Sequence, residues 1–398
     1  MALSKRIVLA FSGGLDTSYC AAVLRDQGYD VITVFVNSGG FNKKSLQLIK
    51  KKALRIGVSR HFIVSSAKDI YRKIISYLIK SNGLYQNIYP QMCADRYIIV
   101  EKCIEIAKRE RAAMIAHGCT AMGNDQVRFD VSIRALSNYK IVAPIRDLQA
   151  RIKTNLREHE INYLKKKGIK VSALHKRYTI NQNVFGVTIS GSEIDKGDEP
   201  KESAFILTKA VMKSGTKPQY VKIGFKKGLP VSLNRRKIDG YTILTKLNKI
   251  VGNHGCGRFI YTGDCVVGIK GRIVFECPGL YALITAHRAL EEMVLSKEQN
   301  QFKEIMSQKW AYLVYSGLYF DPLRQDIEKF IDSHQDYVTG EVVLKIHQGS
   351  LMPVKCSSAY MIKEKGTVYA QSSTWQPKEA EGFVKLFGIA TTLAKRRP

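Results

Sequence analysis

The chain has 398 residues, of which 45% are hydrophobic and 24% charged, a composition typical of soluble globular proteins and a length that suggests two or three domains. No apolar run approaches the length of a membrane-spanning helix, and no signal-peptide pattern precedes the first apolar run, so we expect a cytoplasmic protein. The 63 basic residues outnumber the 34 acidic ones and give a formal net charge of +29, which raises the question of a nucleic-acid partner.

The first part of the chain alternates strand and helix patterns. Apolar runs predict strands at residues 7–11, 31–36, 61–65 and 112–116. Helical periodicity predicts helices among them at residues 17–27, 46–56, 68–80 and 96–111. Such alternation is typical of a doubly wound parallel sheet, an α/β fold in which ligands bind beyond the carboxyl ends of the strands.

The first predicted strand runs directly into Ser-Gly-Gly-Leu-Asp-Thr-Ser at residues 12–18. Two adjacent glycines allow a sharp turn close to a ligand, and the following hydroxyls and free amides can face an anion. Leu15 stands where a P-loop would continue towards its lysine, so transfer of a γ-phosphoryl group is not expected. The pattern resembles the pyrophosphate loop of N-type ATP pyrophosphatases, which cleave ATP between the α- and β-phosphates. An ordinary glycine turn is the alternative, but it needs no such series of hydroxyls and carboxylate.

A second polar loop, at residues 117–130, follows the strand predicted at 112–116. Asn124 and Asp125 can bind an amine or a hydroxyl, and Arg128 can hold a carboxylate through two hydrogen bonds. A capped loop that opens the next helix is the alternative. Because both polar loops follow strands, we expect them to face one cleft. His117 is expected to be a structural, hydrogen-bonded histidine.

Beyond Pro144 the pattern changes class. After a helix predicted at residues 158–167, β-rich segments follow at 220–225, 230–233, 260–269, 273–275 and 338–347. Further helices are predicted at residues 281–293, 299–313 and 379–395. The last has an apolar face with Phe383, Leu386 and Phe387, which can dock on another subunit or fold back on its own chain.

At several motifs the resemblance to one family becomes specific. Segments 10–18, 117–130, 178–181, 254–258 and 268–272, together with the Tyr89-Pro90 step, occur in the order found in argininosuccinate synthases, and the resemblance covers nearly the whole chain. It implies ligation of citrulline to aspartate: ATP activates the ureido oxygen as an adenylate, pyrophosphate leaves, and the aspartate amine displaces AMP. It also implies an ATP-binding domain over residues 1–165, a synthetase domain of α+β class over 166–365, and a C-terminal helix within 366–398 that is exchanged in a homotetramer.

The same resemblance assigns site residues. The triphosphate would be held by the first loop and its flanks: Ala10, Phe11, Ser12, Gly13, Gly14, Leu15, Asp16, Thr17 and Ser18. Mg²⁺ would bridge phosphate oxygens near Asp16, and adenosine would lie beside Val36 and Gly118. The positions that match aspartate-binding residues are Thr120, Asn124 and Asp125. The positions that match citrulline-binding residues are Tyr89, Asn124, Arg128, Thr179 and Thr188. The residues expected to act in catalysis are Asp16, Asn124 and Arg128.

Some positions depart from the family pattern. A citrulline-contacting hydroxyl is lost at Ala94, a glutamate at Gly263 and a tyrosine hydroxyl at Phe275. Asp95 or Asp264 can supply the missing carboxylate. The departures can equally mark a ligase for a modified ureido compound.

Two other functions stay open. A tRNA-modifying adenylase built on the same loop would suit the charge of +29, but the chain shows neither a reactive cysteine pair nor an RNA-binding appendage. Its basic runs are scattered, which favours solvated surfaces over one nucleic-acid site. An inactive binding protein is disfavoured because both loops keep their polar residues. The eight cysteines include no Cys-x-x-Cys pair, so we expect free thiols and no zinc site.

Overall fold

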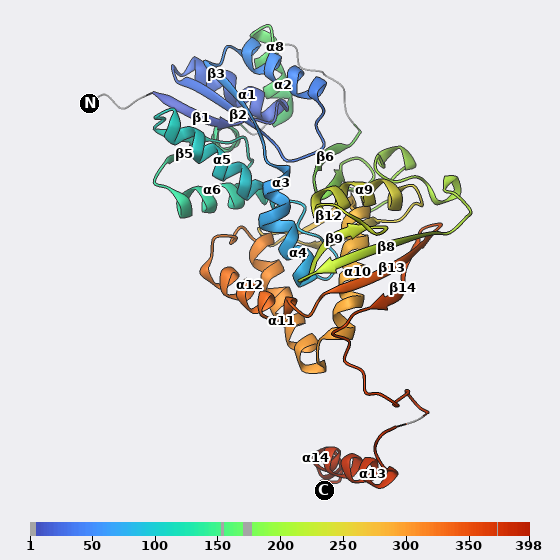
Figure 1. Cartoon of the computed structure of the whole chain (residues 1–398). Helices are drawn as coiled ribbons and strands as arrows, with labels where there is room; N and C mark the ends of the chain where they lie inside the picture. The colour runs from blue at the N-terminus through green and yellow to red at the C-terminus, as the bar shows by residue number, and fades with distance from the viewer. Residues whose placement is uncertain (1–4, 153–154, 170–176, 372) are drawn as a thin grey trace.

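The computed structural model describes residues 5–152, 155–169, 177–371 and 373–398 (Figure 1). Its first part is built on a parallel sheet with the strand order β3-β2-β1-β4-β5. The strands are β1 (Arg6–Ala10), β2 (Asp30–Asn37), β3 (Arg60–Ser65), β4 (Met114–Ala116) and β5 (Lys140–Val142). Strand β1 is central, because Ile7 pairs with Val31 of β2 on one side and with Met114 of β4 on the other. The four predicted strands are confirmed, and β5 is an addition.

Helices cover both faces of this sheet. They are α1 (Leu15–Asp26), α2 (Lys43–Ile56), α5 (Asp95–Arg109), α6 (Asp125–Leu136), α7 (Pro144–Arg151) and α8 (Leu156–Lys166), whereas α3 (Ala67–Ile70) and α4 (Ser76–Ser81) pack with the second part of the chain. Ile7 and Leu9 pack with residues of α1, α2, α7 and α8, whereas Val8 packs with α5 and α6. Because alternate residues of β1 are buried on opposite faces, the doubly wound α/β prediction is confirmed. The helix predicted at 68–80 contains a π-helical turn, Tyr71–Ile75, between α3 and α4.

The second part contains two antiparallel sheets. One has the order β11-β12-β7-β6 and the other β10-β9-β8-β13-β14. Their strands are β6 (Thr179–Asn183), β7 (Gly186–Ser190), β8 (Gln219–Lys226), β9 (Leu229–Leu233), β10 (Arg236–Lys237), β11 (Arg258–Asp264), β12 (Lys270–Glu276), β13 (Gly340–His347) and β14 (Ser350–Ser357). The strand predicted at 260–269 is too long, because β11 ends at Asp264 and the chain turns back through Gly268, which has φ +84°.

Helices of the second part pack against these sheets. The long ones are α9 (Gly240–Gly252), α10 (Pro278–Val294), α11 (Lys297–Tyr315) and α12 (Pro322–Gln335), and short 3-10 turns cover Glu202–Ala204 and Val211–Lys213. The α+β prediction for this part is confirmed. Among the described helices, none is long and apolar enough to cross a membrane.

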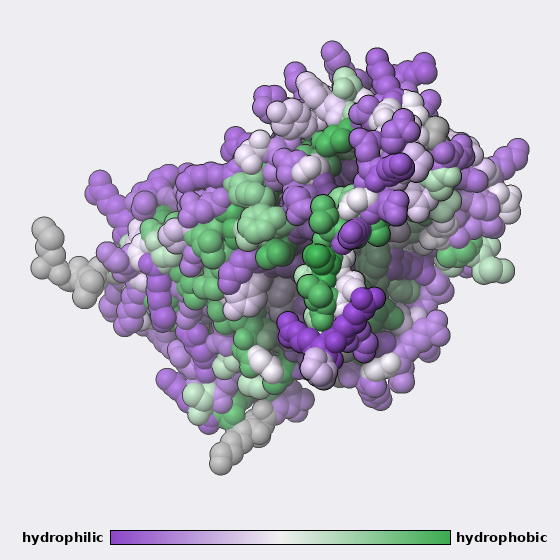
Figure 2. Space-filling model, turned by 90° about the horizontal axis from the view of Figure 1, so that it is seen from below, coloured by the Kyte–Doolittle hydropathy of each residue, from purple (hydrophilic) through white to green (hydrophobic). Residues whose placement is uncertain are grey.

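The C-terminal segment ends in two helices that lie apart from the rest of the chain (Figure 1). They are α13 (Pro377–Phe387) and α14 (Ile389–Lys395), neither of which has a buried residue. The prediction of one continuous helix at 379–395 is wrong, because Gly388 separates α13 from α14. Glycine weakens the interior of a helix. In the view from below, which faces this end of the molecule, apolar side chains lie at the surface among hydrophilic ones (Figure 2).

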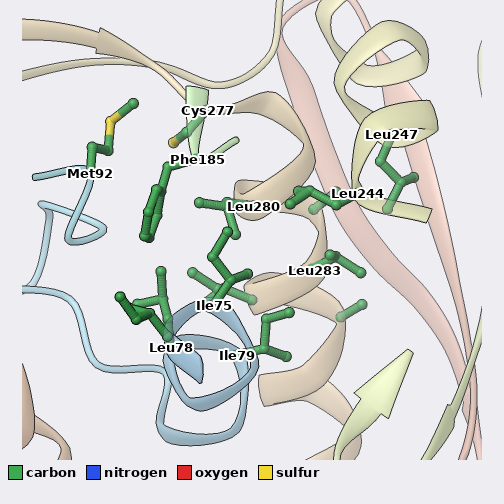
Figure 3. Close-up of a cluster of buried hydrophobic side chains, with 14 of the residues drawn as sticks. Ile75, Leu78, Ile79, Met92, Phe185, Leu244, Leu247, Cys277, Leu280 and Leu283 are labelled. Atoms are coloured by element: carbon green, nitrogen blue, oxygen red, sulfur yellow. The ribbon is translucent and has the colours of Figure 1, made fainter. Parts of the chain in front are cut away.

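The largest apolar core joins segments from both parts of the chain. Ile75 and Ile79 pack beside Leu280 and Leu283 of α10, with Leu244 of α9 farther along the same layer (Figure 3). Residues from Ala67 to Ile98 thus lie in one core with the second part, although they precede the last strands of the first sheet. This packing fixes the two parts relative to each other and supports the cavity between them. The domain limits given above stay a prediction.

Candidate active site

Both polar loops line one cavity between the two parts of the chain. The cavity measures about 460 Å³, and we call it the central cavity. Its walls from the first part include Asp16, Tyr89, Gly118, Thr120, Asn124, Asp125 and Arg128. Its walls from the second part include Asn181, Thr188, Ser190, Tyr261, Arg272 and Tyr315. The expectation that the two loops face one cleft is confirmed.

The first loop, residues 12–18, forms a closed turn at the start of α1. The Gly14 N–H donates to Ser12 Oγ at 3.2 Å, and Ser12 Oγ lies 3.1 Å from Thr17 Oγ1. Ser18 Oγ donates to the Gly14 carbonyl at 2.5 Å. Gly13 has φ +75°, a conformation that favours glycine. The turn therefore gathers hydroxyls and a helix N-terminus in one place, which suits an anion.

The second loop lies directly beside the first. A Cβ added to Gly118 would be 3.1 Å from Thr17 Cγ2 and 3.4 Å from the Thr17 N atom, so the glycine allows a tight approach of the two loops. Val36 is buried at the end of β2. Thr179 is exposed at the start of β6 and pairs with Ser190, which itself lines the central cavity.

Asp16 is paired with a carboxyl group that the sequence did not reveal. Its side chain shares a hydrogen bond with Glu160 of α8, and burial raises the pKa of Asp16 above its ordinary value. Burial, followed by the negative charge of Asp16, raises the pKa of Glu160 to about 8. One proton is therefore held between the two carboxyl groups at neutral pH. No local motif marks Glu160, which is brought to Asp16 by the packing of α8 on α1.

Asp125 lies between two arginines. Its oxygens accept hydrogen bonds from Arg96 Nε at 3.1 Å and from Arg128 Nη1 at 2.8 Å. Burial alone would raise the pKa of Asp125, but the charges of both guanidinium groups hold it below the ordinary value. Asp125 is thus a carboxylate, and the cluster carries a net charge of +1 from these three side chains.

Tyr315, at the end of α11, holds the second loop from across the cavity. Its carbonyl accepts hydrogen bonds from Arg128, and its hydroxyl accepts one from Asn124 Nδ2 at 3.2 Å. Asn124 Oδ1 accepts a further bond from the Val266 N–H at 3.0 Å. His117 Nε2 lies 2.7 Å from Asp130 Oδ1 and the side chain is buried, as expected of a hydrogen-bonded histidine.

The three departures from the family pattern lie in packed surroundings. Ala94 is buried, and the buried ring of Phe275 packs edge-on against Tyr89 with centroids 5.6 Å apart. A Cβ added to Gly263 would overlap with Gln86 Oε1 and with the Tyr261 hydroxyl. These two groups therefore occupy the space next to the Gly263 backbone.

The two carboxylates that could compensate are both engaged elsewhere. Asp95 accepts hydrogen bonds from Arg96 Nη1 at 2.6 Å and from Asn183 Nδ2 at 3.1 Å. Asp264 is paired with Lys270 and accepts a bond from Gln86 Nε2 at 2.7 Å. Neither belongs to the lining of the central cavity.

Comparisons with known proteins cover nearly all of the chain. Residues 6–170 match the family model described as arginosuccinate synthase N-terminal HUP domain, and residues 178–394 match arginosuccinate synthase C-terminal domain. An argininosuccinate synthase of Xylella fastidiosa is 46% identical over 98% of this chain and 97% of its own length. Those of Pyrococcus furiosus and Methanocaldococcus jannaschii are 41% and 38% identical over 98% of this chain, and over 94% and 98% of their own lengths.

Among solved structures, a predicted subunit of a tRNA methyltransferase from Methanocaldococcus jannaschii matches 41% of this chain and 88% of its own length. The identity is 18% and the TM-score 0.27.

Proposed function

The chain belongs to the argininosuccinate synthase family, and from this premise we propose how its central cavity carries out the reaction. The protein is a carbon–nitrogen ligase of arginine biosynthesis that condenses citrulline with aspartate and releases AMP and pyrophosphate. The full-length similarity carries this conclusion, and one cavity lined by both polar loops supports it.

The first loop holds ATP for the adenylation step. A ureido oxygen is a poor leaving group until it is adenylated, so the enzyme must bind the departing pyrophosphate and align the reacting groups. The Ser12–Thr17 hydroxyl pair and the N-terminal amides of α1 supply donors for phosphate oxygens, and the buried Ser18 hydroxyl holds the turn through the Gly14 carbonyl. Adenosine lies between Val36 and Gly118 in this proposal.

Mg²⁺ fits the same end of the cavity. In the described part of the chain, no group of three His, Cys, Asp or Glu side chains could hold a metal ion by itself. ATP oxygens would supply most of the coordination, and Asp16 would hold the ion once the shared proton resides on Glu160, since a carboxylate is the hard-oxygen ligand that Mg²⁺ prefers. When bound, the ion neutralises developing charge on the phosphates.

The second loop receives the amino-acid substrates. Three of the five N–H groups of Arg128 are used on Tyr315 and Asp125, which leaves one on each terminal nitrogen for a citrulline carboxylate. Tyr89, Thr179 and Thr188 complete the citrulline side in this proposal. Aspartate binds at Thr120, Asn124 and Asp125, where its amine can approach the activated carbon.

Assembly and location are proposed from the family resemblance. The exposed apolar side chains of α13 and α14 suit helices exchanged between subunits of a cytoplasmic homotetramer. Residues 1–165 would bind ATP, residues 166–365 would complete the synthetase site, and 366–398 would join the subunits.

A modified ureido compound is a second candidate acceptor. This alternative is favoured because Asp95 and Asp264 are both tied into ion pairs and Gly263 has no room for a glutamate. The two carboxyl groups named in the cavity walls are also engaged, Asp125 by Arg96 and Arg128 and Asp16 by Glu160, so neither is left unpaired for a free α-ammonium group. Citrulline with an acylated α-amine would not need a carboxylate there.

Product analysis tests these functions. Purified protein incubated with ATP, Mg²⁺, citrulline and aspartate should release AMP and pyrophosphate in equal amounts. Formation of ADP, or no turnover, would contradict the proposed function. Parallel reactions in which Nα-acetylcitrulline or bulk tRNA replaces citrulline decide between the acceptors, because only the true acceptor should stimulate pyrophosphate release.

A further inference from the structure

Lys52 of α2 reaches the first loop from outside the motif. Its Nζ donates a hydrogen bond to the Gly13 carbonyl at 2.7 Å. The contact is part of a wider packing of α2 on the loop, since a Cβ added to Gly13 would lie 3.3 Å from Ile49 Cγ1. The neighbouring Lys50 and Lys51 are exposed. Within this run of three lysines, Lys52 is therefore the one directed at the loop.

The hydrogen bond to Gly13 also orients Gly14. The Gly13 carbonyl and the Gly14 N–H belong to one peptide group, in which a trans geometry points them in opposite directions. An ammonium that holds the carbonyl oxygen on one side therefore directs the N–H to the other side. There the Gly14 N–H meets Ser12 Oγ at 3.2 Å, next to Thr17 Oγ1. A charged donor on the carbonyl also polarises the peptide and strengthens its N–H as a donor.

Among the described residues, no carboxylate balances the charge of Lys52. In the part of the chain that the structure describes, no Asp or Glu oxygen forms an ion pair with Lys52. The side chain is half-buried, and this burial lowers the pKa of its ammonium group. A cation kept in such a place, beside a loop of hydroxyls and free amides, is suited to an anionic ligand.

We propose that Lys52 is the positioning residue of the pyrophosphate loop: it locks the Gly13–Gly14 peptide, whose N–H holds Ser12 Oγ, so that the Ser12–Thr17 hydroxyl pair faces the leaving pyrophosphate, and its charge offsets that of the β- and γ-phosphates. The inference rests on the proposed function, because it takes ATP cleavage to occur at this loop. Lys52 would then supply from α2 a positive charge that the loop itself lacks at Leu15.

Binding of inorganic pyrophosphate, measured by calorimetry on the full chain without turnover, tests the proposal directly. We expect Lys52→Met to weaken pyrophosphate binding and to raise the KM for ATP, each by about tenfold or more, as the loss of a charge-assisted hydrogen bond predicts. The KM values for citrulline and aspartate should change less than about twofold. Lys52→Gln, which keeps an N–H donor without the charge, should be intermediate, and Lys52→Arg should recover most of the binding.

Lys51→Met is the matched control, because it removes one exposed lysine from the same turn of α2 and should leave all constants unchanged. Pyrophosphate binding equal in wild type and Lys52→Met would overturn the proposal. A second result would also overturn it: in Lys52→Met all three KM values rise equally and the melting temperature falls, and Lys52→Arg restores neither. This is the result expected of a lysine with a purely structural role. If Lys52→Met does not fold, the Gln and Arg variants decide by the same measure. Wild-type protein that binds pyrophosphate but forms no AMP would instead contradict the proposed function and leave the role of Lys52 at the loop standing.

Discussion

The backbone carbonyl of Tyr315 accepts two hydrogen bonds from the guanidinium group of Arg128, at 3.0 Å from Nε and 2.8 Å from Nη2. The Tyr315 ring also lies 5.0 Å from the same guanidinium, which adds a cation–π contact. A residue at the end of α11 thus holds an arginine of α6 in one orientation. The orientation in which Arg128 would bind a substrate carboxylate therefore depends on the packing of the two parts of the chain.

Arg128→Lys should therefore be a severe change although it keeps the charge. A lysine has no planar fork and cannot bond the Tyr315 carbonyl, Asp125 and a substrate carboxylate together. We expect kcat/KM for citrulline to fall by about 100-fold or more. Tyr315→Phe is the control, because it keeps the carbonyl and removes only the hydroxyl with its bonds to Asn124 and Tyr261, and the resulting loss of kcat/KM should stay below tenfold. Steady-state kinetics of both variants check this, and an Arg128→Lys enzyme within tenfold of wild type would remove Arg128 from the site.

The Asp16–Glu160 pair predicts a pH dependence of stability. The pKa of Glu160 is raised from 4.5 to about 8 in the folded protein, so the folded chain keeps a proton that the unfolded chain releases near pH 4.5. The associated stability is complete below pH 4.5 and is lost as the pH rises to about 8. Glu160→Gln stays neutral at every pH and should remove this decline.

At pH 9 the ligand-free Glu160→Gln protein should be more stable than ligand-free wild type by about 2 kcal/mol. This is less than the whole pKa shift of Glu160 implies, because the two carboxyl groups titrate together. Urea unfolding at several pH values measures the difference. Glu158→Gln, an exposed change on the same helix, should follow wild type. Parallel curves for wild type and Glu160→Gln would mean that the pair holds no proton.

Gly263 should tolerate no side chain while Gln86 keeps its present position. A methyl group at Gly263 would overlap with Gln86 Oε1 and with the Tyr261 hydroxyl, which are themselves hydrogen-bonded at 2.7 Å. We expect Gly263→Ala to lower the free energy of unfolding by about 1–3 kcal/mol and to raise the KM for citrulline. Adding Gln86→Ala should recover part of the stability, since it removes one of the overlapping atoms. Thermal unfolding of the single and double variants tests this, and a Gly263→Ala protein as stable as wild type would contradict it.

Local sequence patterns predicted the parts of the site that are set by neighbouring residues, namely the two polar loops and the strands before them. The first loop and the second loop both follow buried strands, and the order of parallel strands brings Asp16 and Asn124 to one cavity. Tyr315 could not be found this way, because 187 residues separate it from Arg128 and its contact is made by a backbone carbonyl. Lys52 has the same residue type as its exposed neighbours, and its contact with the loop became visible only with α2 packed beside Gly13.

Contacts between residues far apart in the sequence also explain why the core around residues 67–98 and the break at Gly388 were not predicted. Residues from Ala67 to Ile98 read as part of the alternating first domain, yet their apolar side chains join the core around α10. The amphipathic pattern of residues 379–395 continues past Gly388, so periodicity alone did not reveal the break between α13 and α14. In both cases the spacing of apolar residues shows that a segment has an apolar face, but it does not show which element packs on that face.

The apolar face of α13 should be required for assembly. Phe383 and Phe387 stack with their ring centroids 5.2 Å apart, yet their exposed fractions are 64% and 75%. Exposed aromatic surface of this extent is costly in water and is typical of an interface. We expect the wild-type chain to elute as a homotetramer and Phe383→Ser/Phe387→Ser as a smaller species in size-exclusion chromatography with light scattering. Lys385→Ser, a polar change on the same helix, should leave the assembly intact. Because the central cavity is lined by residues far from α13, the double variant should keep at least part of its pyrophosphate release, and an unchanged tetramer would show that α13 is not the contact.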